Sequence, residues 1–353
     1  MSRPRRDQPF VEGTLETKAG AVPRVFATLT WADRWGSIKA RWGVGRMRFT
    51  VDPGLYALGN PDDQSPVLVT ANYKMSFDRL REALPGRGAW ILVLDTNGIN
   101  VWCAAGKGTF GTEELVQRIA SRGLTQVVAH QELILPQLSG PGVAAHQVRK
   151  RSGFKVIYGP IKATDLPAFL DTGLKATPEM RRKTFTLRER TVLVPVELVG
   201  TLKWSLLILP LFFLTGGLGG EAGFWNNALQ NGLFAVVALL SALAAGAVLT
   251  PMLLPWLPGR AFSLKGCIMG LITSAILGAL WIGGFSAPGE LTQLLAWFFL
   301  IPAISAYLAM NFTGASTYTS LSGVRKEMRW AVPLEIAGGA AGLCLWLGAL
   351  FAA

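Results

Sequence analysis

One short segment of the chain contains residue types that could carry chemistry. It runs Thr96-Asn97-Gly98-Ile99-Asn100-Val101-Trp102-Cys103-Ala104-Ala105-Gly106-Lys107-Gly108. The chain has three cysteines, and Cys267 and Cys344 both fall within long apolar stretches that predict packing roles. A thiolate is a nucleophile and a soft metal ligand, and a nearby positive charge such as that of Lys107 stabilises it. Cys103 is therefore the leading candidate for a functional residue.

The pair Gly106-Lys107 raises the question of a phosphate-binding loop. A Walker A motif needs a glycine five residues before the Gly-Lys pair and a serine or threonine after it. Those positions hold Val101 and Gly108. The segment does not have the spacing of a nucleotide-binding loop.

Two interpretations of Cys103 stay open from the residues alone. A lone cysteine in a glycine-rich turn is often a small packing residue, whereas a cysteine after a strand, near a lysine, is typical of a reactive thiolate. A hydrolase would also need a base, and His130 and His146 have the right side chain but no supporting spacing. A zinc site would need more ligands than this segment supplies.

Short apolar runs alternate with amphipathic ones around this segment. We predict strands at Val67–Tyr73, Ala89–Asp95, Gln126–Ala129 and Lys155–Tyr158, and helices at Ser76–Leu84, Thr112–Ser121, Val143–Arg151 and Asp165–Leu170. The alternation predicts a Rossmann-like α/β domain with a mostly parallel sheet, whose ligands bind at the carboxyl ends of the strands. Cys103 follows one such strand. The Trp- and Arg-rich stretch before Val67 gives no assignment.

Composition separates this domain from the rest of the chain. The 353 residues have a net charge of +12 and a mean hydropathy of +0.36, which is high for a soluble enzyme. The basic residues cluster at 3–6, 24–48 and 175–190, and the last cluster directly precedes the first long apolar run. That position favours a membrane surface over nucleic acid, and no nucleic-acid-binding module is recognisable. The N-terminus has no apolar core of a signal peptide.

The second half of the chain predicts five transmembrane helices. The apolar runs are long enough to cross about 30 Å of hydrocarbon, and they lie at Leu193–Leu214, Leu233–Leu254, Cys267–Phe285, Leu291–Asn311 and Ala331–Phe351. The first contains Glu197 and Lys203 near its start, where side chains can reach the interface. Few ionisable residues lie within the spans, which favours an anchor over a pump.

Charges in the loops predict the orientation of these helices. The loops after the second and fourth spans carry Arg260, Lys265, Arg325, Lys326 and Arg329, whereas the other two loops contain no lysine or arginine. Basic loops face the cytoplasm. We therefore expect a protein of the cytoplasmic (inner) membrane, with its N-terminal half in the cytoplasm and its C-terminus outside.

The string Asn100-Val101-Trp102-Cys103-Ala104-Ala105-Gly106-Lys107 matches the signature of a known family. The chain resembles the corrinoid proteins of microbial mercury methylation, which join a corrinoid-binding domain to five membrane helices. The soluble half is also similar to the corrinoid domain of the large subunit of the corrinoid iron–sulfur protein. We expect a Trp- and Arg-rich segment over residues 1–60, a domain over 61–175, a basic juxtamembrane linker over 176–192 and a transmembrane domain over 193–353. The resemblance implies that the domain over 61–175 binds a corrinoid and contains a cap helix.

The resemblance assigns Cys103 as the catalytic residue and as the lower axial ligand of cobalt in a base-off, cobalamin-type corrinoid. It implies that the cap helix contacts the cofactor through Asn100, Val101, Trp102, Cys103, Ala104, Ala105, Gly106 and Lys107. A thiolate is a strongly donating ligand, and such a ligand favours releasing a methyl group with electron density on carbon. The implied activity is methyl transfer from methyl-Co(III) to Hg(II), giving methylmercury.

The resemblance also implies partners. One is a ferredoxin-like protein with two 4Fe–4S clusters that returns cobalt to Co(I), and another is a methyltransferase that loads the corrinoid from methyltetrahydrofolate. Two alternatives stay open: a corrinoid methyl carrier with another acceptor, such as a thiol, a metalloid or an acetyl-CoA-pathway acceptor, and a non-catalytic corrinoid-binding membrane protein.

Overall fold

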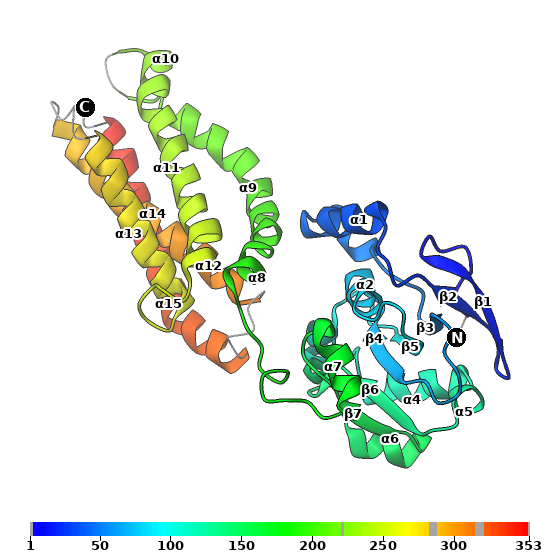
Figure 1. Ribbon diagram of the computed structural model, residues 1–353. Helices are drawn as coiled ribbons and strands as arrows, with labels where there is room; N and C mark the ends of the chain where they lie inside the picture. The colour runs from blue at the N-terminus through cyan, green and yellow to red at the C-terminus, as the bar shows by residue number, and fades with distance from the viewer. Residues whose placement is uncertain (1–2, 220–221, 282–287, 315–320, 352–353) are drawn as a thin grey trace. The chain divides into compact units, whose positions relative to one another are not determined.

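The computed structural model describes residues 3–219, 222–281, 288–314 and 321–351. It divides the chain into two compact units, Met1–Thr184 and Phe185–Ala353 (Figure 1). The first is an α/β domain and the second is helical, as the sequence predicts. The finer domain limits at residues 60, 175 and 192 remain predictions.

The described residues of the N-terminal unit form one seven-stranded sheet and seven α-helices. The strands are β1 (Val11–Thr17), β2 (Gly20–Val25), β3 (Gly54–Leu58), β4 (Val67–Ala71), β5 (Ala89–Leu94), β6 (Glu132–Leu135) and β7 (Lys155–Tyr158). The helices are α1 (Trp31–Arg41), α2 (Lys74–Glu82), α3 (Val101–Lys107), α4 (Thr112–Ser121), α5 (Leu124–Val127), α6 (Ala145–Ser152) and α7 (Leu166–Asp171), with 3-10 turns η1 (Arg46–Arg48), η2 (Gln137–Ser139) and η3 (Ala163–Asp165).

The strand order is β1-β2-β3-β5-β4-β6-β7. Strands β4, β5, β6 and β7 are parallel, whereas β3 pairs antiparallel to β5 and β1 antiparallel to β2. From β4 the chain moves to β5 on one side and then crosses to β6 on the other. This reversal creates a switch point between β4 and β6, where the connections leave in opposite directions and ligands commonly bind.

Both faces of the sheet are buried. In β5, Trp90, Leu92 and Leu94 belong to one core cluster, which also contains residues of α3, α4, α5 and α6. The alternate residues Ala89, Ile91 and Val93 belong to a second cluster with residues of α2 and α7. Burial on both faces explains why β5 is a continuous apolar run and why β4 is apolar apart from Thr70.

Most predicted elements of this unit are confirmed. Helix α4 and strand β7 have the predicted bounds, and β4, β5, α2, α6 and α7 differ by a few residues. The strand predicted at Gln126–Ala129 is wrong, because Leu124–Val127 is the short helix α5 and the strand lies at Glu132–Leu135. Gly123 has a φ of 57° and starts that helix. The left-handed conformation at Gly123 outweighs the strand preference of Val127 and Val128.

The C-terminal unit contains the five predicted membrane-length helices. They run over Leu187–Thr215, Phe224–Leu253, Phe262–Leu280, Leu291–Gly314 and Ser322–Phe351. Their segments are α8 (Leu187–Thr191), α9 (Val194–Thr215), α10 (Phe224–Asn227), α11 (Leu233–Leu243), α12 (Thr250–Leu253), α13 (Phe262–Trp281), α14 (Pro288–Asn311) and α15 (Leu321–Phe351), with π-helical turns between α10, α11 and α12. The predicted end of the third span, Phe285, lies outside the described residues.

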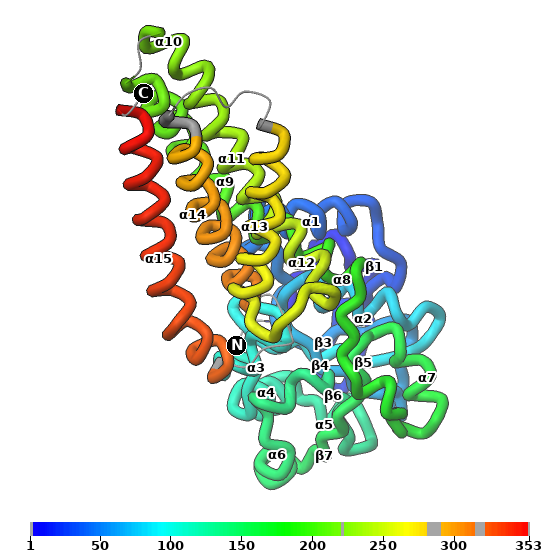
Figure 2. Tube along the Cα trace, turned by 90° about the vertical axis from the view of Figure 1, so that its left-hand side faces the viewer, coloured from blue at the N-terminus to red at the C-terminus, as the bar shows by residue number. Residues whose placement is uncertain are grey.

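Helix α14 lies between α11, α13 and α15 within this unit (Figure 2). Glycines allow the close approach: a Cβ at Gly266 would lie 2.4 Å from the carbonyl oxygen of Ser305, and one at Gly270 would lie 2.5 Å from Cα of Pro302. Small residues at helix contacts are typical of membrane proteins, where close packing replaces hydrophobic burial.

Candidate functional site

The loop that follows β5 is held in place by a buried amide. Asn72, the residue after β4, accepts hydrogen bonds through Oδ1 from the backbone N–H of Thr96 (3.1 Å), the hydroxyl of Thr96 (2.8 Å) and the backbone N–H of Gly98 (3.0 Å). Its Nδ2 donates to Asp95 (3.2 Å). One side chain thus joins the carboxyl ends of β4 and β5.

Helix α4 holds the same loop from the other side. The backbone N–H of Asp95 donates to Oε1 of Glu114 at 2.9 Å. The same carboxylate is paired with Arg118 at 2.5 Å, one turn along the helix. Because Arg118 is buried, this pair fixes the Glu114 side chain in the orientation that the loop requires.

The loop contains a position where only glycine fits. Gly98 has a φ of 71°, and a Cβ there would lie 2.8 Å from Cγ2 of Thr50. Its neighbour Asn97 also has a positive φ, of 55°. This sharp turn redirects the chain from the end of β5 into α3.

Helix α3 presents Cys103. Asn100 is its N-cap, and Oδ1 of Asn100 accepts the backbone N–H of Cys103 at 2.9 Å. Gly108, with a φ of 82°, ends the helix. The signature segment is therefore a complete capped helix whose first residue fixes the backbone of the cysteine.

The two faces of α3 differ. Ala104 and Ala105 are buried in the core, and Gly142 packs so closely that a Cβ on it would lie 2.9 Å from Cα of Ala105. The opposite face carries Cys103, which is half-buried, and the exposed Gly106 and Lys107 at positions i+3 and i+4. A Cβ at Gly106 would meet no atom within 4 Å. The surface beside the thiol is therefore open.

The remaining signature residues have intermediate positions. Val101 and Trp102 are half-buried, and Val101 packs against the core. Helix α3 contacts the turn η2 after β6 and also contacts β4. The structure thus brings Cys103 to the switch point between β4 and β6.

The side chains around Cys103 limit the kind of metal centre to which it could be a ligand. Within the described residues, no group of three His, Cys, Asp or Glu side chains is placed to hold a metal ion. A metal bound to Cys103 would therefore need most of its ligands from elsewhere, such as a macrocycle that brings its own.

Neither histidine supports a hydrolase. His130 donates from Nε2 to the carbonyl of Ser65 (2.9 Å) and accepts at Nδ1 from the backbone N–H of Glu132 (3.2 Å). His146 is exposed on α6. In the part of the chain that the structure describes, neither ring hydrogen-bonds to the Cys103 thiol, so a Cys–His pair does not form.

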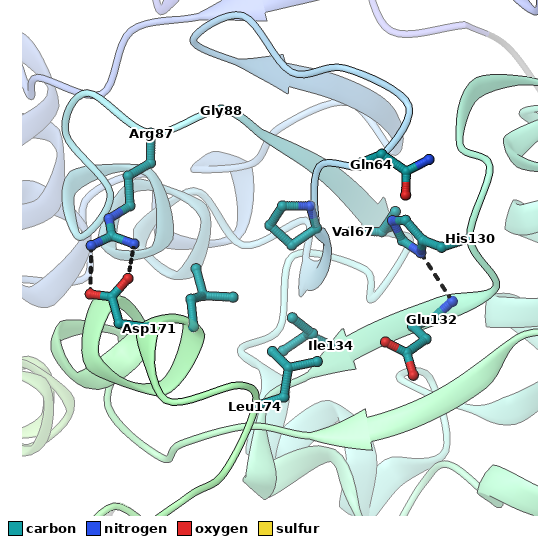
Figure 3. Close-up of a pocket in the computed structure, with 11 residues that line it drawn as sticks. Gln64, Val67, Arg87, Gly88, His130, Glu132, Ile134, Asp171 and Leu174 are labelled. Carbon is teal, nitrogen blue, oxygen red and sulfur yellow. Dashed lines mark hydrogen bonds and ion pairs between the residues drawn. The ribbon is translucent and has the colours of Figure 1, made fainter.

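His130 instead lines a hollow of about 530 Å³ at the amino ends of β4 and β6, the edge of the sheet opposite to Cys103 (Figure 3). Its charged side chains pair with residues of their own surroundings: Arg87 with Asp171 at 2.7 and 2.8 Å, and Glu132 with Lys155 at 3.0 Å. Because these charges are already paired, the α3 surface remains the candidate site.

Sequence reasoning proposed Asn100, Cys103 and Lys107 as site residues but did not identify the residues that hold the loop before α3. Asn72 gives no local signal, since it lies far from α3 along the chain. The Glu114 and Arg118 pair, four residues apart in a predicted helix, could have been recognised as an ion pair, though not as a support for the loop.

Comparisons with known proteins concern this same region. A family model described as the CO dehydrogenase/acetyl-CoA synthase delta subunit matches residues 44–170, which include α3. The gamma subunit of the acetyl-CoA decarbonylase/synthase complex from Methanopyrus kandleri is 33% identical over 124 residues, covering 34% of this chain and 26% of the relative. The N-terminal unit holds a domain like the large subunit of the corrinoid iron–sulfur protein.

Two further relatives match a similar length of this chain. The gamma subunit from Methanothermobacter thermautotrophicus is 30% identical over 123 residues, covering 34% of this chain and 26% of the relative. The gamma 2 subunit from Methanosarcina thermophila is 30% identical over 133 residues, covering 36% and 27%. The chain thus spans about a quarter of the length of these relatives. Its β1, β2 and α1 precede the segment that the family model matches, and its five membrane-length helices follow it.

Proposed function

We propose that this protein is a membrane-anchored, corrinoid-dependent methyltransferase that passes a methyl group to Hg(II), giving methylmercury. One observation carries this proposal: the half-buried Cys103 thiol lies on the open face of α3, inside the domain similar to the corrinoid iron–sulfur protein. Cys103 would be the lower axial ligand of the cobalt.

The residues around Cys103 fit such a cofactor. A corrin brings the equatorial ligands of its metal, so a site with a single thiolate suffices. Gly106 leaves space for a flat macrocycle beside the sulfur, and Asn100 fixes the backbone of the ligand. Lys107 places a positive charge one turn from the thiolate. Ala104 and Ala105 support the helix from the core and face away from this surface.

A bound corrinoid would supply methyl-transfer chemistry, and donation from the Cys103 thiolate would favour transfer to an electrophilic acceptor such as Hg(II). The protein contributes the thiolate, its orientation and the open face of α3. His130 does not compete with the thiolate as a ligand, because it lies at the opposite sheet edge in the described structure. This arrangement supports a base-off corrinoid.

The chain needs partners for turnover. A 4Fe–4S cluster takes four cysteines, and the chain has three in all, of which Cys103 is the proposed ligand. We infer that a separate ferredoxin-like protein with two such clusters supplies electrons, and that a methyltransferase loads the corrinoid from methyltetrahydrofolate. The five apolar helices would anchor the chain in the cytoplasmic membrane, with its N-terminal unit in the cytoplasm.

A second candidate is a corrinoid methyl carrier with a different acceptor. The relatives favour it, because their names assign them to an acetyl-CoA decarbonylase/synthase complex. The match of residues 100–107 to the mercury-methylation signature favours Hg(II). Both candidates use Cys103 and differ only in the acceptor.

A cellular assay separates the two candidates. Cells carrying this chain and the ferredoxin-like partner receive Hg(II), and methylmercury is measured with the wild type, Cys103→Ala and Cys344→Ala, a matched loss of a cysteine from α15. We expect product from the wild type and Cys344→Ala and none from Cys103→Ala. Equal product from Cys103→Ala would refute the proposed ligand, and no methylmercury from the wild type, with a methylated corrinoid present, would favour another acceptor.

A further inference from the structure

Helix α1 and its C-cap residue, Trp42, expose a stripe of large apolar side chains. Trp31, Trp35, Ile38 and Trp42 recur at positions i, i+4, i+7 and i+11, and their exposed fractions are 75%, 44%, 45% and 45%. Trp31 and Trp35 stack with ring centroids 5.7 Å apart. We call this stripe the α1 apolar face. Contiguous exposed apolar surface of this kind commonly marks an interaction site.

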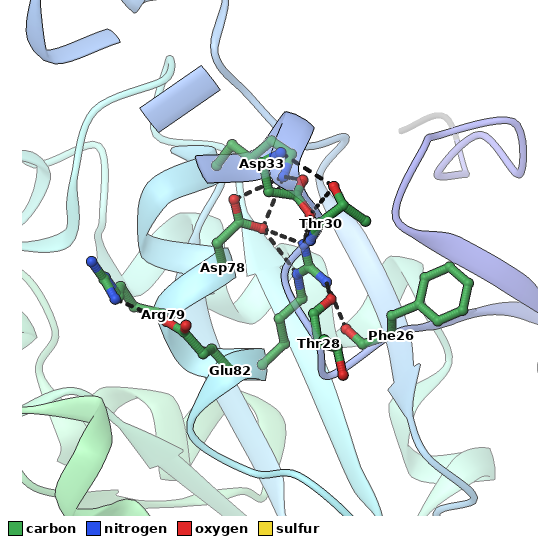
Figure 4. Close-up of polar contacts among 9 residues, drawn as sticks. Phe26, Thr28, Thr30, Asp33, Asp78, Arg79 and Glu82 are labelled. Atoms are coloured by element: carbon green, nitrogen blue, oxygen red, sulfur yellow. Dashed lines mark hydrogen bonds and ion pairs between the residues drawn. The ribbon is translucent and has the colours of Figure 1, made fainter. Parts of the chain in front are cut away.

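The inward face of α1 is charged instead of apolar. Asp33 is buried, and its carboxylate accepts from Nζ of Lys74 at 2.5 Å and from Arg81 at 2.8 Å (Figure 4). Gly36 and Ala40 complete this face, and a Cβ at Gly36 would lie 2.6 Å from the ring of Phe49. Amphipathic helices usually bury their apolar side, and α1 does the reverse.

The buried charges prevent α1 from turning its tryptophans inward. Asp78 bridges Lys74 and Arg81, at 2.8 and 2.9 Å, and Arg81 also donates to the carbonyl of Phe26 at 2.7 Å. Rotating the helix would remove Asp33 from this network and leave buried cations short of a counter-charge, which is costly. The outward direction of the tryptophans is therefore built into the fold.

Basic residues surround the α1 apolar face. Arg34, Lys39 and Arg48 are exposed, and Asp33 is the only acidic residue between positions 31 and 51. Its charge is already paired internally. Exposed tryptophans flanked by arginine and lysine are typical of helices that lie in the interface of an anionic membrane. The same chain has five membrane-length helices, so a membrane is a plausible partner for this face.

We propose that the α1 apolar face docks on an anionic lipid surface. The indole rings enter the interface, and the basic side chains contact lipid phosphates. The segment after α1 packs on the loop between β5 and α3, because a Cβ at Gly98 in that loop would lie 2.8 Å from Cγ2 of Thr50 and 3.3 Å from the carbonyl oxygen of Met47. Docking would thus hold the loop that leads into α3 next to the membrane surface, whatever the methyl acceptor is.

Hydrogen–deuterium exchange of the full chain in nanodiscs tests this proposal. Exchange of the α1 amides is compared between discs with and without anionic phosphatidylglycerol. We expect slower exchange in the anionic discs, and loss of this difference in the double variant Arg34→Gln/Lys39→Gln. Each basic residue near an anionic surface accounts for about fivefold in partitioning, so the double variant should dock about 25-fold more weakly.

The matched control removes the same charge from another surface. Arg149→Gln/Lys150→Gln replaces two exposed basic residues of α6 and should leave α1 protection unchanged. Exchange of the α2 amides is measured in every variant as a check that the buried ion network under α1 is intact. Equal α1 exchange in both kinds of disc overturns the proposal. Protection that appears only after a soluble protein partner is added also overturns it and assigns the face to that partner.

Discussion

The contact that Asn100 makes with the backbone of Cys103 is local, and a local contact of this kind can be recognised in the sequence. Asn100 caps the same short helix that carries the thiol, and its hydrogen bond spans three residues. Asn72 acts on residues 24 and 26 positions away along the chain. A contact between residues so far apart in the chain depends on how β4 and β5 pair. The sequence alone does not reveal that pairing.

Gly106 makes the open face of α3 testable without removing the ligand. We predict that Gly106→Leu leaves the chain as stable as the wild type or slightly more so, because glycine inside a helix costs about 1 kcal/mol and the position has free space. Corrinoid binding, measured by equilibrium dialysis, should fall at least tenfold (about 1.4 kcal/mol), and Gly106→Ala should have a smaller effect. Full binding by Gly106→Leu would show that the cofactor lies elsewhere.

Substitutions at Gly98 and Gly86 form a matched pair that separates backbone strain from steric contact. Gly98 and Gly86 have φ values of 71° and 73°, but only at Gly98 would a Cβ meet a neighbour, Cγ2 of Thr50. Gly86→Ala should lower the free energy of unfolding by about 1 kcal/mol through backbone strain. Gly98→Ala should lower it by about 2 kcal/mol more, because of overpacking.

Urea unfolding of the N-terminal unit within the detergent-solubilised chain measures both effects. Adding Thr50→Ser, which removes Cγ2, should recover most of the extra loss in the Gly98→Ala variant. Equal losses at Gly98 and Gly86 would mean that the contact between the loop and Thr50 does not form.

At the scale of elements, regular patterns were predictable and irregular ones were not. Helix α4 has acidic residues in its first turn and a glycine shortly after its end, and its bounds were predicted correctly. Strands β1, β2 and β3 lie in or beside the Trp- and Arg-rich stretch, to which the sequence alone gave no assignment. Helix α1 shows the reason: its apolar stripe faces outward and its inward face is held by ions, so its pattern does not report burial in the usual way.

The ion network under α1 predicts a pH dependence. Burial raises the pKa of Asp33, but hydrogen bonds from Lys74 and Thr30 and the charges of Lys74 and Arg81 outweigh it, so the net pKa lies below the usual 3.8. Burial raises the pKa of Asp78 above that value despite the same two cations. Protonation of Asp78 therefore favours the folded state, whereas protonation of Asp33 opposes it.

The pKa shifts of Asp33 and Asp78 change stability in opposite directions as the pH falls. Acidification from neutral pH down to about 4 should not weaken the docking of α1 on α2, because Asp78 takes up its proton first. Below pH 3.8 the stabilisation from Asp33 is lost progressively as the pH falls through its folded-state pKa. Exchange rates of the α1 amides measure this. An Asp33→Asn variant should be weakened at neutral pH and should not show the acid-induced loss; the same loss in that variant would assign it to another group.

At the scale of the whole molecule, the membrane-length helices were the most predictable feature. A run of about 20 apolar residues crosses a bilayer whatever it packs against, so five helices could be counted without knowing their contacts. Their packing was not predictable, because it depends on where single glycines such as Gly266 and Gly270 meet α14.

The basic loops predict an orientation that reporter fusions can measure. Alkaline phosphatase fused after Ala353 should be active, because the C-terminus is expected outside, and a fluorescent protein fused there should stay dark in the periplasm. The same reporters at the N-terminus should give the reverse result. A fluorescent C-terminal fusion with inactive phosphatase would place the C-terminus in the cytoplasm and contradict the predicted topology.

The role of Cys103 is tested most directly by the absorption spectrum of the corrinoid bound to the purified full-length chain. The spectrum should show thiolate ligation to cobalt. Cys103→Ala should lose that signature while Cys344→Ala keeps it, because only Cys103 lies on the open face of α3. An unchanged spectrum of the bound corrinoid in Cys103→Ala would contradict the account.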